Sequence, residues 1–253
     1  MSGPLAGRTV LLTGTSGGIG AATAQRLLAD GADLLGQYRS GREAAEAAVD
    51  GPHRDRATLL AGDLSTPQGA RELWRAAEAE RPVDVLVLNA ATIAPTPFDG
   101  DDETWDAGWA EQLAVNVVGA GALLREAVRT FASRGGGTAV VLSSWSAEQG
   151  SRLLDVSGYA ASKAAIRNLA QTLARHFARD GVRVVVLAPG VVDTGMGVAG
   201  QSAEQAAAVA GLMASGELVG ADEVADLVSY LASDRCPSLT GATLDLNGAS
   251  YVR

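Results

Sequence analysis

The segment that decides the fold reads TVLLTGTSGGIG and occupies residues 9–20. Its first five residues are apolar or β-branched, which predicts a short buried strand. Glycines then cluster between positions 14 and 20, and helix-forming residues follow at 21–28. This order is typical of a pyrophosphate-binding loop, because glycines admit the phosphates and the helix N-terminus points free N–H groups at them. We therefore expect a dinucleotide to contact Gly14, Ser16, Gly18, Ile19 and Gly20.

The rest of the chain alternates predicted strands with predicted helices. Strands are expected at 33–37, 58–61, 83–88, 138–142, 182–187 and 243–246, and helices at 41–49, 67–80, 111–132, 157–177 and 221–231. Such alternation implies right-handed βαβ crossovers. The predicted fold is α/β: a single doubly wound Rossmann-type domain over 1–253, with a seven-stranded, mostly parallel sheet and helices on both faces. Six glycines mark 191–220 as a substrate flap.

Composition narrows the choice of partners. A net charge of −9 over 253 residues disfavours nucleic acid and anionic lipid surfaces. No apolar run approaches the ~20 residues that cross a bilayer, and the first residues do not resemble a signal peptide. The single cysteine, Cys236, cannot form an internal disulfide, which fits a reducing compartment. We expect a cytoplasmic protein that binds neither nucleic acid nor membrane and holds no metal.

The glycine segment also fits a second motif. Residues 14–18 read GTSGG, which matches the G-x-S-x-G turn of α/β-hydrolases with Ser16 as the nucleophile. That chemistry requires an acid and a histidine later in the chain. The two histidines, His53 and His176, lie in ordinary loop and helix sequence. The hydrolase interpretation is therefore disfavoured.

A phenol and an ammonium group lie four residues apart in Tyr159-Ala160-Ala161-Ser162-Lys163. On a helix both side chains share one face. A free tyrosine has a pKa of about 10 and is a poor base at neutral pH. A nearby lysine cation is expected to lower the pKa of Tyr159, so that it can exchange a proton near neutral pH.

Taken together, the glycine segment and the Tyr159–Lys163 pair resemble the short-chain dehydrogenase/reductase family, in the same order and at a similar separation. The resemblance spans nearly the whole chain. Within the family, the chain resembles the 3-oxoacyl-carrier-protein reductase-like members. It implies that Asn116 holds a water that links Lys163 to solvent. It also implies cofactor contacts, beyond the glycine loop, from Asp63, Leu64, Asn89, Tyr159, Lys163, Pro189, Gly190 and Thr194.

The family's catalytic serine, which would hydrogen-bond the substrate oxygen, has two candidates. Ser144 follows the predicted strand directly but lies 15 residues before Tyr159 rather than the usual 13. Ser146 has the usual spacing but lies past the strand end. We favour Ser144 with a longer loop, and Ser146 stays open.

The residues that end the second strand indicate the cofactor. Proteins that bind NAD place a carboxylate here, which accepts hydrogen bonds from the ribose hydroxyls. Residues 36–40 read GQYRS and contain no carboxylate. Arg39 can pair with a 2′-phosphate and Ser40 can add a hydroxyl. The sequence favours NADP over NAD.

The resemblance predicts an NADP(H)-dependent oxidoreductase that converts a small or medium carbonyl to an alcohol, or the reverse, with a Ser-Tyr-Lys-Asn site. It also implies a homodimer or homotetramer. The alternative is a non-catalytic nucleotide sensor or scaffold of the same fold. The substrate is not readable from the sequence, although the few charges in 191–220 argue against a strongly anionic one.

Overall fold

The computed structural model describes residues 3–194, 210–211 and 213–252. One sheet contains all seven strands in the order β3-β2-β1-β4-β5-β6-β7, and every neighbouring pair is parallel. The doubly wound α/β prediction is therefore confirmed. The strands are β1 (Thr9–Thr13), β2 (Asp33–Tyr38), β3 (Ala57–Ala61), β4 (Val85–Leu88), β5 (Gly137–Leu142), β6 (Val182–Pro189) and β7 (Thr243–Leu246).

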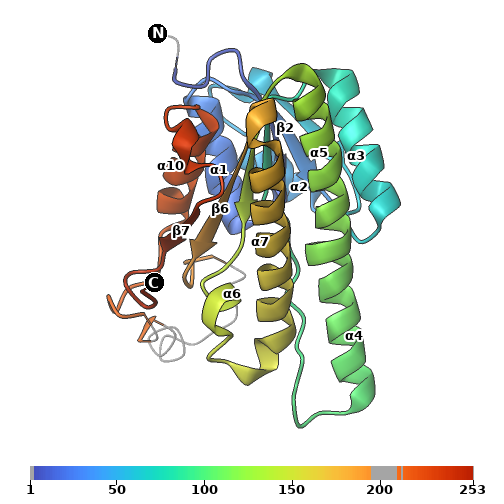
Figure 1. Ribbon diagram of the computed structural model, residues 1–253, viewed down its shortest axis with the longest axis vertical. Helices are drawn as coiled ribbons and strands as arrows, with labels where there is room; N and C mark the ends of the chain where they lie inside the picture. The colour runs from blue at the N-terminus through green and yellow to red at the C-terminus, as the bar shows by residue number, and fades with distance from the viewer. Residues whose placement is uncertain (1–2, 195–209, 212, 253) are drawn as a thin grey trace.

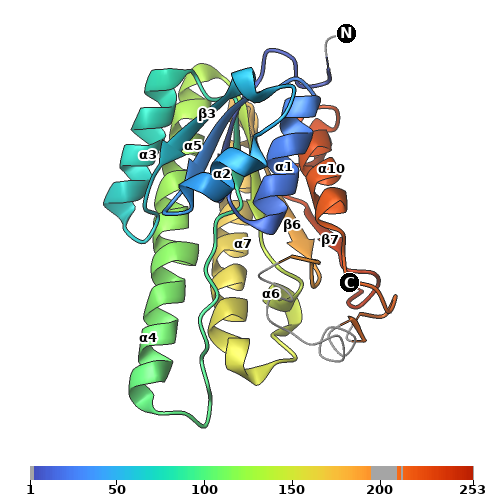
Figure 2. The ribbon, with the colours of Figure 1, turned by 180° about the vertical axis from the view of Figure 1, so that it is seen from behind.

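Helices cover both faces of this sheet (Figures 1 and 2). One layer contains α1, α2 and α10, and the other contains α3, α5 and α7. In Figure 1, α4 continues the line of α5 and extends well beyond the sheet. The helices are α1 (Gly18–Ala29), α2 (Arg42–Ala48), α3 (Pro67–Glu80), α4 (Asp102–Leu113), α5 (Ala120–Arg134), α6 (Ser146–Gln149), α7 (Ser157–Phe177) and α10 (Ala221–Ala232).

The central strands are mostly apolar because both of their faces are covered. In β1, Leu11 packs into the core beneath α3, α5 and α7, whereas Val10 and Leu12 pack into the core beneath α1 and α10. On the first side Phe131 is fully buried and meets Trp74 edge to face, with 5.8 Å between ring centroids. The two cores hold the strand ends in fixed register, which is what positions the site.

Among the predicted boundaries that differ from the structure, two have a clear local cause. The helix expected from about 111 begins at Asp102, because the Asp101 carboxylate accepts from the Thr104 amide at 2.7 Å and caps it. It then continues through a π-helical stretch, Ala114–Gly119, before α5. The strand expected from Val83 begins at Val85, since the amide of Val83 donates instead to the Glu78 side chain at 3.0 Å.

The carboxyl ends of the parallel strands meet at one edge of the sheet, where ligands bind in such folds. Most of the predicted flap, 195–209 and 212, lies outside the described residues. Its described ends are joined by a parallel bridge between Val192 and Val219. Within the described part of the chain, no helix is long and apolar enough to span a bilayer.

Candidate active site

The glycine loop between β1 and α1 folds tightly. A Cβ atom on Gly20 would lie 2.0 Å from the carbonyl oxygen of Gly14, so a side chain there would force the turn open. A Cβ on Gly18 would lie 2.4 Å from Cγ2 of Thr194, which reaches the loop from beyond β6. The glycines therefore let helix α1 begin directly beneath the loop, with Thr194 packed on its first turn.

The capping residue of α1 offers no side-chain acceptor to the first backbone amides of the helix. Gly17 occupies the N-cap and supplies no side chain, and the first turn holds no acidic residue. The first amides of a helix need partners and form a positive dipole end that favours anions. They border a cleft of about 550 Å³, lined by Gly14, Ser16, Gly17, Gly18, Ile19, Gly20, Gln37, Arg39, Ser40, Asp63, Leu64, Asn89, Tyr159, Lys163, Pro189 and Thr194 among others. These residues fit a dinucleotide whose phosphates rest on α1.

Most predicted cofactor contacts thus lie on one cleft, and each has a local structural basis. Asn89, just after β4, donates from Nδ2 to the Thr13 carbonyl at 2.9 Å and so ties the ends of β1 and β4 together. Asp63 caps its own turn through the Ser65 amide and hydroxyl, which lowers the pKa of its carboxyl together with the charge of Arg39. Arg39 and Ser40 are exposed at the far end of the cleft, after β2.

Sequence reasoning missed Gln37, which is buried at the end of β2. Its Oε1 accepts from the Gly14 amide at 2.9 Å and its Nε2 donates to the Gly62 carbonyl at 2.7 Å. Gln37 therefore fixes the glycine loop to the turn after β3 and borders the cleft. A buried polar residue inside an apolar strand was the signal that could have identified it.

Tyr159 and Lys163 lie on α7 and face the same end of the cleft. The Lys163 ammonium lies 5.7 Å from the centroid of the Tyr159 ring and donates to the Leu142 carbonyl at the end of β5 at 2.8 Å. The Ser143 hydroxyl donates to the backbone carbonyl of Lys163 at 3.0 Å. Helix α7 and the end of strand β5 are therefore joined by two hydrogen bonds beside Tyr159 and Lys163.

The expected effect of Lys163 on Tyr159 is not what this structure gives. Burial raises the pKa of Tyr159 to about 12, and burial lowers the pKa of Lys163 to about 8. The lysine is only 4% exposed, while part of the tyrosine surface opens onto the cleft. Desolvation disfavours each charged form and is the cause of both shifts. The tyrosine is therefore a protonated acid at neutral pH.

The two candidate serines contact each other. The hydroxyls of Ser144 and Ser146 lie 3.0 Å apart, and the Ser146 amide donates to Oγ of Ser144 at 3.3 Å. Both serines are buried. The segment after β5 continues alongside β6, since the Trp145 amide donates to the Pro189 carbonyl at 2.9 Å. Ser146 begins the short helix α6, a turn that the sequence did not predict.

Asn116 does not reach the cleft with its side chain. It lies in the π-helical stretch and is 2% exposed. Its Oδ1 accepts from the Thr92 amide at 2.9 Å, and its Nδ2 donates to the Thr92 carbonyl at 2.9 Å and to Ser162 Oγ at 3.0 Å. Asn116 thus ties the segment after β4 to α7, and its predicted water-holding role stays a prediction.

A second cavity of about 300 Å³ adjoins the cleft and shares Tyr159 with it. Its described lining comprises Ile19, Ile93, Ser143, Ser144, Trp145, Ser146, Gln149, Gly150, Ser151, Arg152, Leu153, Val156, Tyr159, Pro189, Gly190, Val191, Val192, Thr194, Ser250 and Tyr251. Of the predicted site residues, Ser144 and Gly190 belong to this cavity and not to the cleft. The phenol of Tyr159 lies where the two spaces meet.

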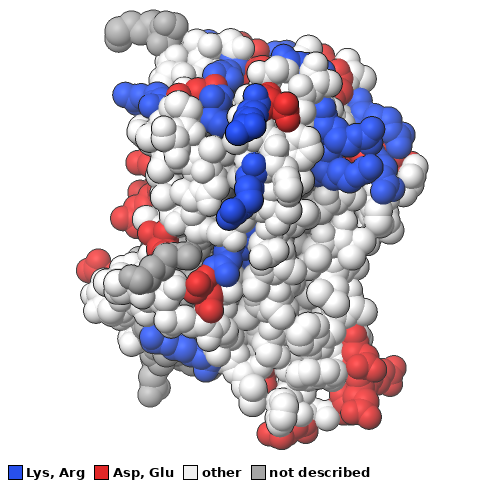
Figure 3. Space-filling view, in the orientation of Figure 1, with Lys and Arg blue, Asp and Glu red and all other residues white. Residues whose placement is uncertain are grey.

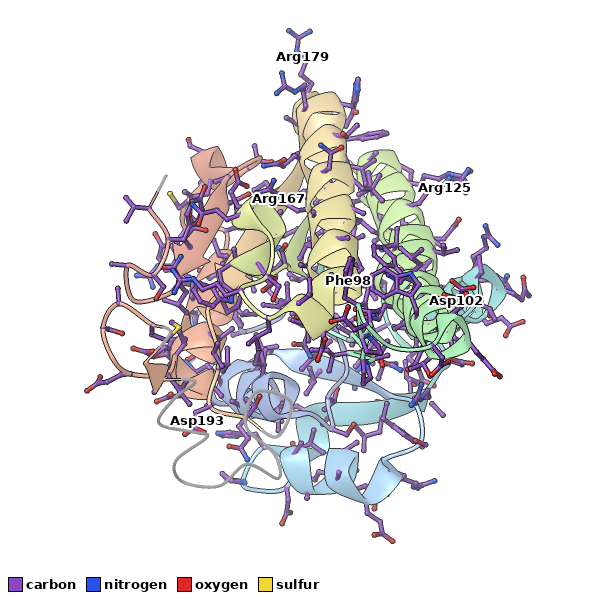
Figure 4. The ribbon with its side chains drawn as sticks, turned by 90° about the horizontal axis from the view of Figure 1, so that it is seen from below. Phe98, Asp102, Arg125, Arg167, Arg179 and Asp193 are labelled. Carbon is purple, nitrogen blue, oxygen red and sulfur yellow. The ribbon has the colours of Figure 1, made fainter. Side chains whose placement is uncertain are left out.

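The hydrolase interpretation finds no support in this geometry. Ser16 lies at the carboxyl end of β1, whereas His53 precedes β3 and therefore lies toward the opposite edge of the parallel sheet. His176 is in the last turn of α7, whose first turn carries Tyr159. Figure 4 shows how far α7 extends, from Phe98 near its start to Arg179 beyond its end. Neither histidine meets Ser16, and the described residues contain no cluster that could hold a metal.

Known proteins share this arrangement. Residues 14–248 match the family model described as Enoyl-(Acyl carrier protein) reductase. The chain is 33% identical to the cis-4-hydroxycyclohexanecarboxylate dehydrogenase of Sinomonas cyclohexanicum over 98% of both chains. It is 32% identical to the 3-oxoacyl-[acyl-carrier-protein] reductase of Escherichia coli, over 97% of this chain and 98% of that one. A crystal structure of the 3-oxoacyl (acyl-carrier-protein) reductase of Agrobacterium tumefaciens with NADP bound superposes with a TM-score of 0.85, at 34% identity, covering 96% of this chain and 94% of that one.

The fold, the cleft and these relatives define an oxidoreductase that acts on CH–OH or C=O groups with a nicotinamide cofactor. The chain belongs to the short-chain dehydrogenase/reductase family.

The lowered pKa of Lys163 predicts a stability effect that can be measured. Burial brings its pKa from the ordinary value of 10.5 to about 8, so the folded state disfavours the charged form. That cost is fully present below pH 8 and disappears as the pH rises toward 10.5. Relative to Lys163→Met, the wild type should gain about 2 kcal/mol of unfolding free energy between pH 7 and pH 9.5. Urea denaturation at both pH values checks this, and parallel pH profiles for the two proteins would contradict it.

Proposed function

We propose that the protein is an NADPH-dependent reductase that converts a small or medium carbonyl compound to its alcohol. The observation that carries the proposal is that Tyr159 borders both the dinucleotide cleft and the second cavity. A proton donor is thus placed between a cofactor site and a substrate site. The acyl-carrier-protein reductase and the hydroxycyclohexanecarboxylate dehydrogenase among the relatives act on the same kind of carbon–oxygen group.

The chain's own residues account for every part of the reaction except the hydride. A reduced nicotinamide held in the cleft would supply that hydride to the carbonyl carbon. Ser144 and Tyr159 hydrogen-bond the substrate oxygen, and Tyr159 gives it a proton. Lys163 remains close enough to stabilise the phenolate that this transfer leaves behind. Asn116 holds the segment after β4 against α7 and, by the family resemblance, supports the resupply of the proton.

The protonation state of the site suits proton donation by Tyr159. With the pKa of Tyr159 raised to about 12, the phenol is protonated throughout the physiological range and is ready to donate. The reverse reaction needs the phenolate as a base, which burial disfavours. Alcohol oxidation therefore requires that the pKa of Tyr159 be lower when cofactor and substrate are bound.

The cofactor preference rests on the end of β2. Arg39 and Ser40 line the exposed end of the cleft. The side chain of Gln37 already hydrogen-bonds the backbone of the glycine loop and of Gly62. Residues 36–40, at the carboxyl end of β2, include no carboxylate that could bind the ribose hydroxyls of NAD. The NADP bound to the relative from Agrobacterium tumefaciens supports the same choice.

Assembly and location are also proposals. In Figure 3 an area without charged side chains extends over α4, α5 and α7, and Leu113 and Val118 are exposed on the α4–α5 column. Apolar helix faces of this kind are covered in oligomers, which supports a homodimer or homotetramer. We further propose that residues 1–253 form one dinucleotide-binding and catalytic domain in the cytoplasm, with 191–220 as its substrate flap.

The central test removes the proton donor. Tyr159→Phe should retain the fold and bind NADPH, but lose turnover by roughly 10²–10⁴-fold, because general acid catalysis contributes that much. NADPH oxidation at 340 nm against ketones, oxo-acids and 3-oxoacyl thioesters measures it, with NADH as the cofactor control. Unimpaired turnover in the variant would overturn the assignment. Tight NADPH binding without turnover of any carbonyl would favour the non-catalytic alternative.

The serine pair predicts a non-additive result. Ser144→Ala should lower kcat by roughly 10²–10³-fold, the usual cost of losing a donor to the developing charge. Ser146→Ala should cost about tenfold less, since Ser146 acts by orienting Ser144, and the double variant should match Ser144→Ala alone. A larger loss in Ser146→Ala than in Ser144→Ala would exchange the two roles.

The cofactor preference predicts a selective loss. Arg39→Ala should weaken NADPH binding by roughly 10–100-fold, as expected for a lost charge-assisted contact to phosphate, and leave NADH binding unchanged. Arg42→Ala is the matched control, because Arg42 begins α2 and pairs with Glu46. Fluorescence titration with both cofactors measures the effect. Equal losses for NADH and NADPH would show that Arg39 does not read the 2′-phosphate.

A further inference from the structure

The wall of the second cavity offers a bound molecule mainly apolar surface. Its described lining includes the aliphatic side chains of Ile93, Leu153 and Val156, which come from two segments of the chain. Ligand pockets of this kind bind through apolar contact and use a few polar groups to fix the orientation of the ligand. Here Ser144 and Tyr159 are the groups that can fix a carbonyl oxygen.

Most of the other polar side chains in the described lining already have hydrogen-bond partners in the protein. The Ser143 hydroxyl donates to a backbone carbonyl of α7 at 3.0 Å, and Oγ of Ser151 accepts from the amide two residues later at 3.0 Å. Oγ of Ser250 accepts from the Ala214 amide at 2.8 Å. These hydroxyls therefore stabilise the loops around the cavity and add little to the recognition of a polar substrate.

The one charged residue of the described lining, Arg152, has protein partners as well. Its guanidinium donates to the Ser250 carbonyl at 3.3 Å and lies 5.3 Å from the centroid of the Trp145 ring, and Arg152 makes a further interaction within the protein. An anionic substrate would have to compete with these contacts. The described lining thus leaves no charged group without a protein partner.

The cavity opens to solvent past two of its apolar side chains. Ile93 and Leu153 line it and yet are 39% and 53% exposed, so they lie at its mouth. The segments that carry them adjoin, because the Thr96 amide donates to the Asp155 carbonyl at 2.7 Å. We call Ile93 and Leu153 the apolar rim. The rim continues the apolar wall from the inside of the cavity to the protein surface.

We propose that the substrate is an uncharged carbonyl compound with an extended apolar group. Its carbonyl binds Ser144 and Tyr159, and its apolar group follows the cavity wall and covers the apolar rim. The inference rests on the reductase function proposed above and names its substrate class. Binding removes the carbons of the substrate and the side chains of the rim from water, and each fully buried CH₂ group strengthens binding about fourfold.

A binding experiment tests the proposal without turnover. A ketone cannot be reduced by protein saturated with NADP⁺, so calorimetric titration of that complex measures affinity alone. It compares 2-octanone with 7-hydroxy-2-heptanone, in which a hydroxyl replaces the terminal methyl group. Wild type should bind 2-octanone roughly 10–100-fold more tightly, because the wall cannot hydrogen-bond the added hydroxyl. Leu153→Asn should lose roughly three- to tenfold of that preference.

The neighbouring leucine provides the matched control. Leu154 is 58% exposed and does not line the cavity, so Leu154→Asn makes the same change beside the rim and should keep the wild-type preference. Equal binding of the two ketones by wild type, tighter binding of 7-oxooctanoate, or an unchanged preference in Leu153→Asn would overturn the proposal. An unchanged preference together with a new oligomeric state of Leu153→Asn in light scattering would assign the rim to a contact between copies of this chain.

Kinetics then separate this inference from the proposed function. With NADPH and the methyl ketones from 2-butanone to 2-octanone, wild-type kcat/KM should rise roughly two- to fourfold for each added carbon. Ile93→Asn and Leu153→Asn should flatten this rise for the longer ketones and leave kcat/KM for 2-butanone within about twofold. A flat wild-type series would also overturn the substrate class. If 2-octanone binding depends on Leu153 but no ketone is reduced, the reductase function fails and the apolar site stands.

Discussion

The burial of a lysine next to the end of β5 is the constraint on which the site depends. Lys163 can be buried only because the Leu142 carbonyl accepts from it, and that bond fixes the first turns of α7 against the sheet. Burial brings the pKa of Lys163 down to about 8, and burial of Tyr159 raises the pKa of that phenol to about 12. The position of the two side chains and their protonation states therefore come from one packing arrangement, that of α7 on β5.

Much of the fold and of the site was predictable from the sequence for physical reasons. Strands covered on both faces are mostly apolar, as the runs from Thr9 and from Val182 are. The glycine loop was predictable because close backbone approach excludes other residues, as the contact of Gly18 with Thr194 illustrates. The cleft brings together nearly all the cofactor residues that the resemblance implied.

What the sequence did not show depends on contacts between distant segments. The pKa of Tyr159 is set by how completely α7 packs on β5, which no local pattern reports. Gln37 acts through Gly14 and Gly62, and neither partner is near it in sequence. The sequence offers Ser144 and Ser146 as alternatives, whereas the turn of α6 brings their hydroxyls to within 3.0 Å of each other.

The order of strands along the sheet has a consequence for how such an enzyme can diversify. Arg39 follows β2 and the loop with Trp145 and Arg152 follows β5, and three strand intervals of about 4.8 Å separate β2 from β5. The residues proposed to bind the 2′-phosphate and the residues that line the second cavity therefore lie at separate places along the edge of the sheet. A substitution at one place can leave the other unchanged, whereas residues between Leu142 and Lys163 line both the cleft and the second cavity, so a change there can alter both spaces at once.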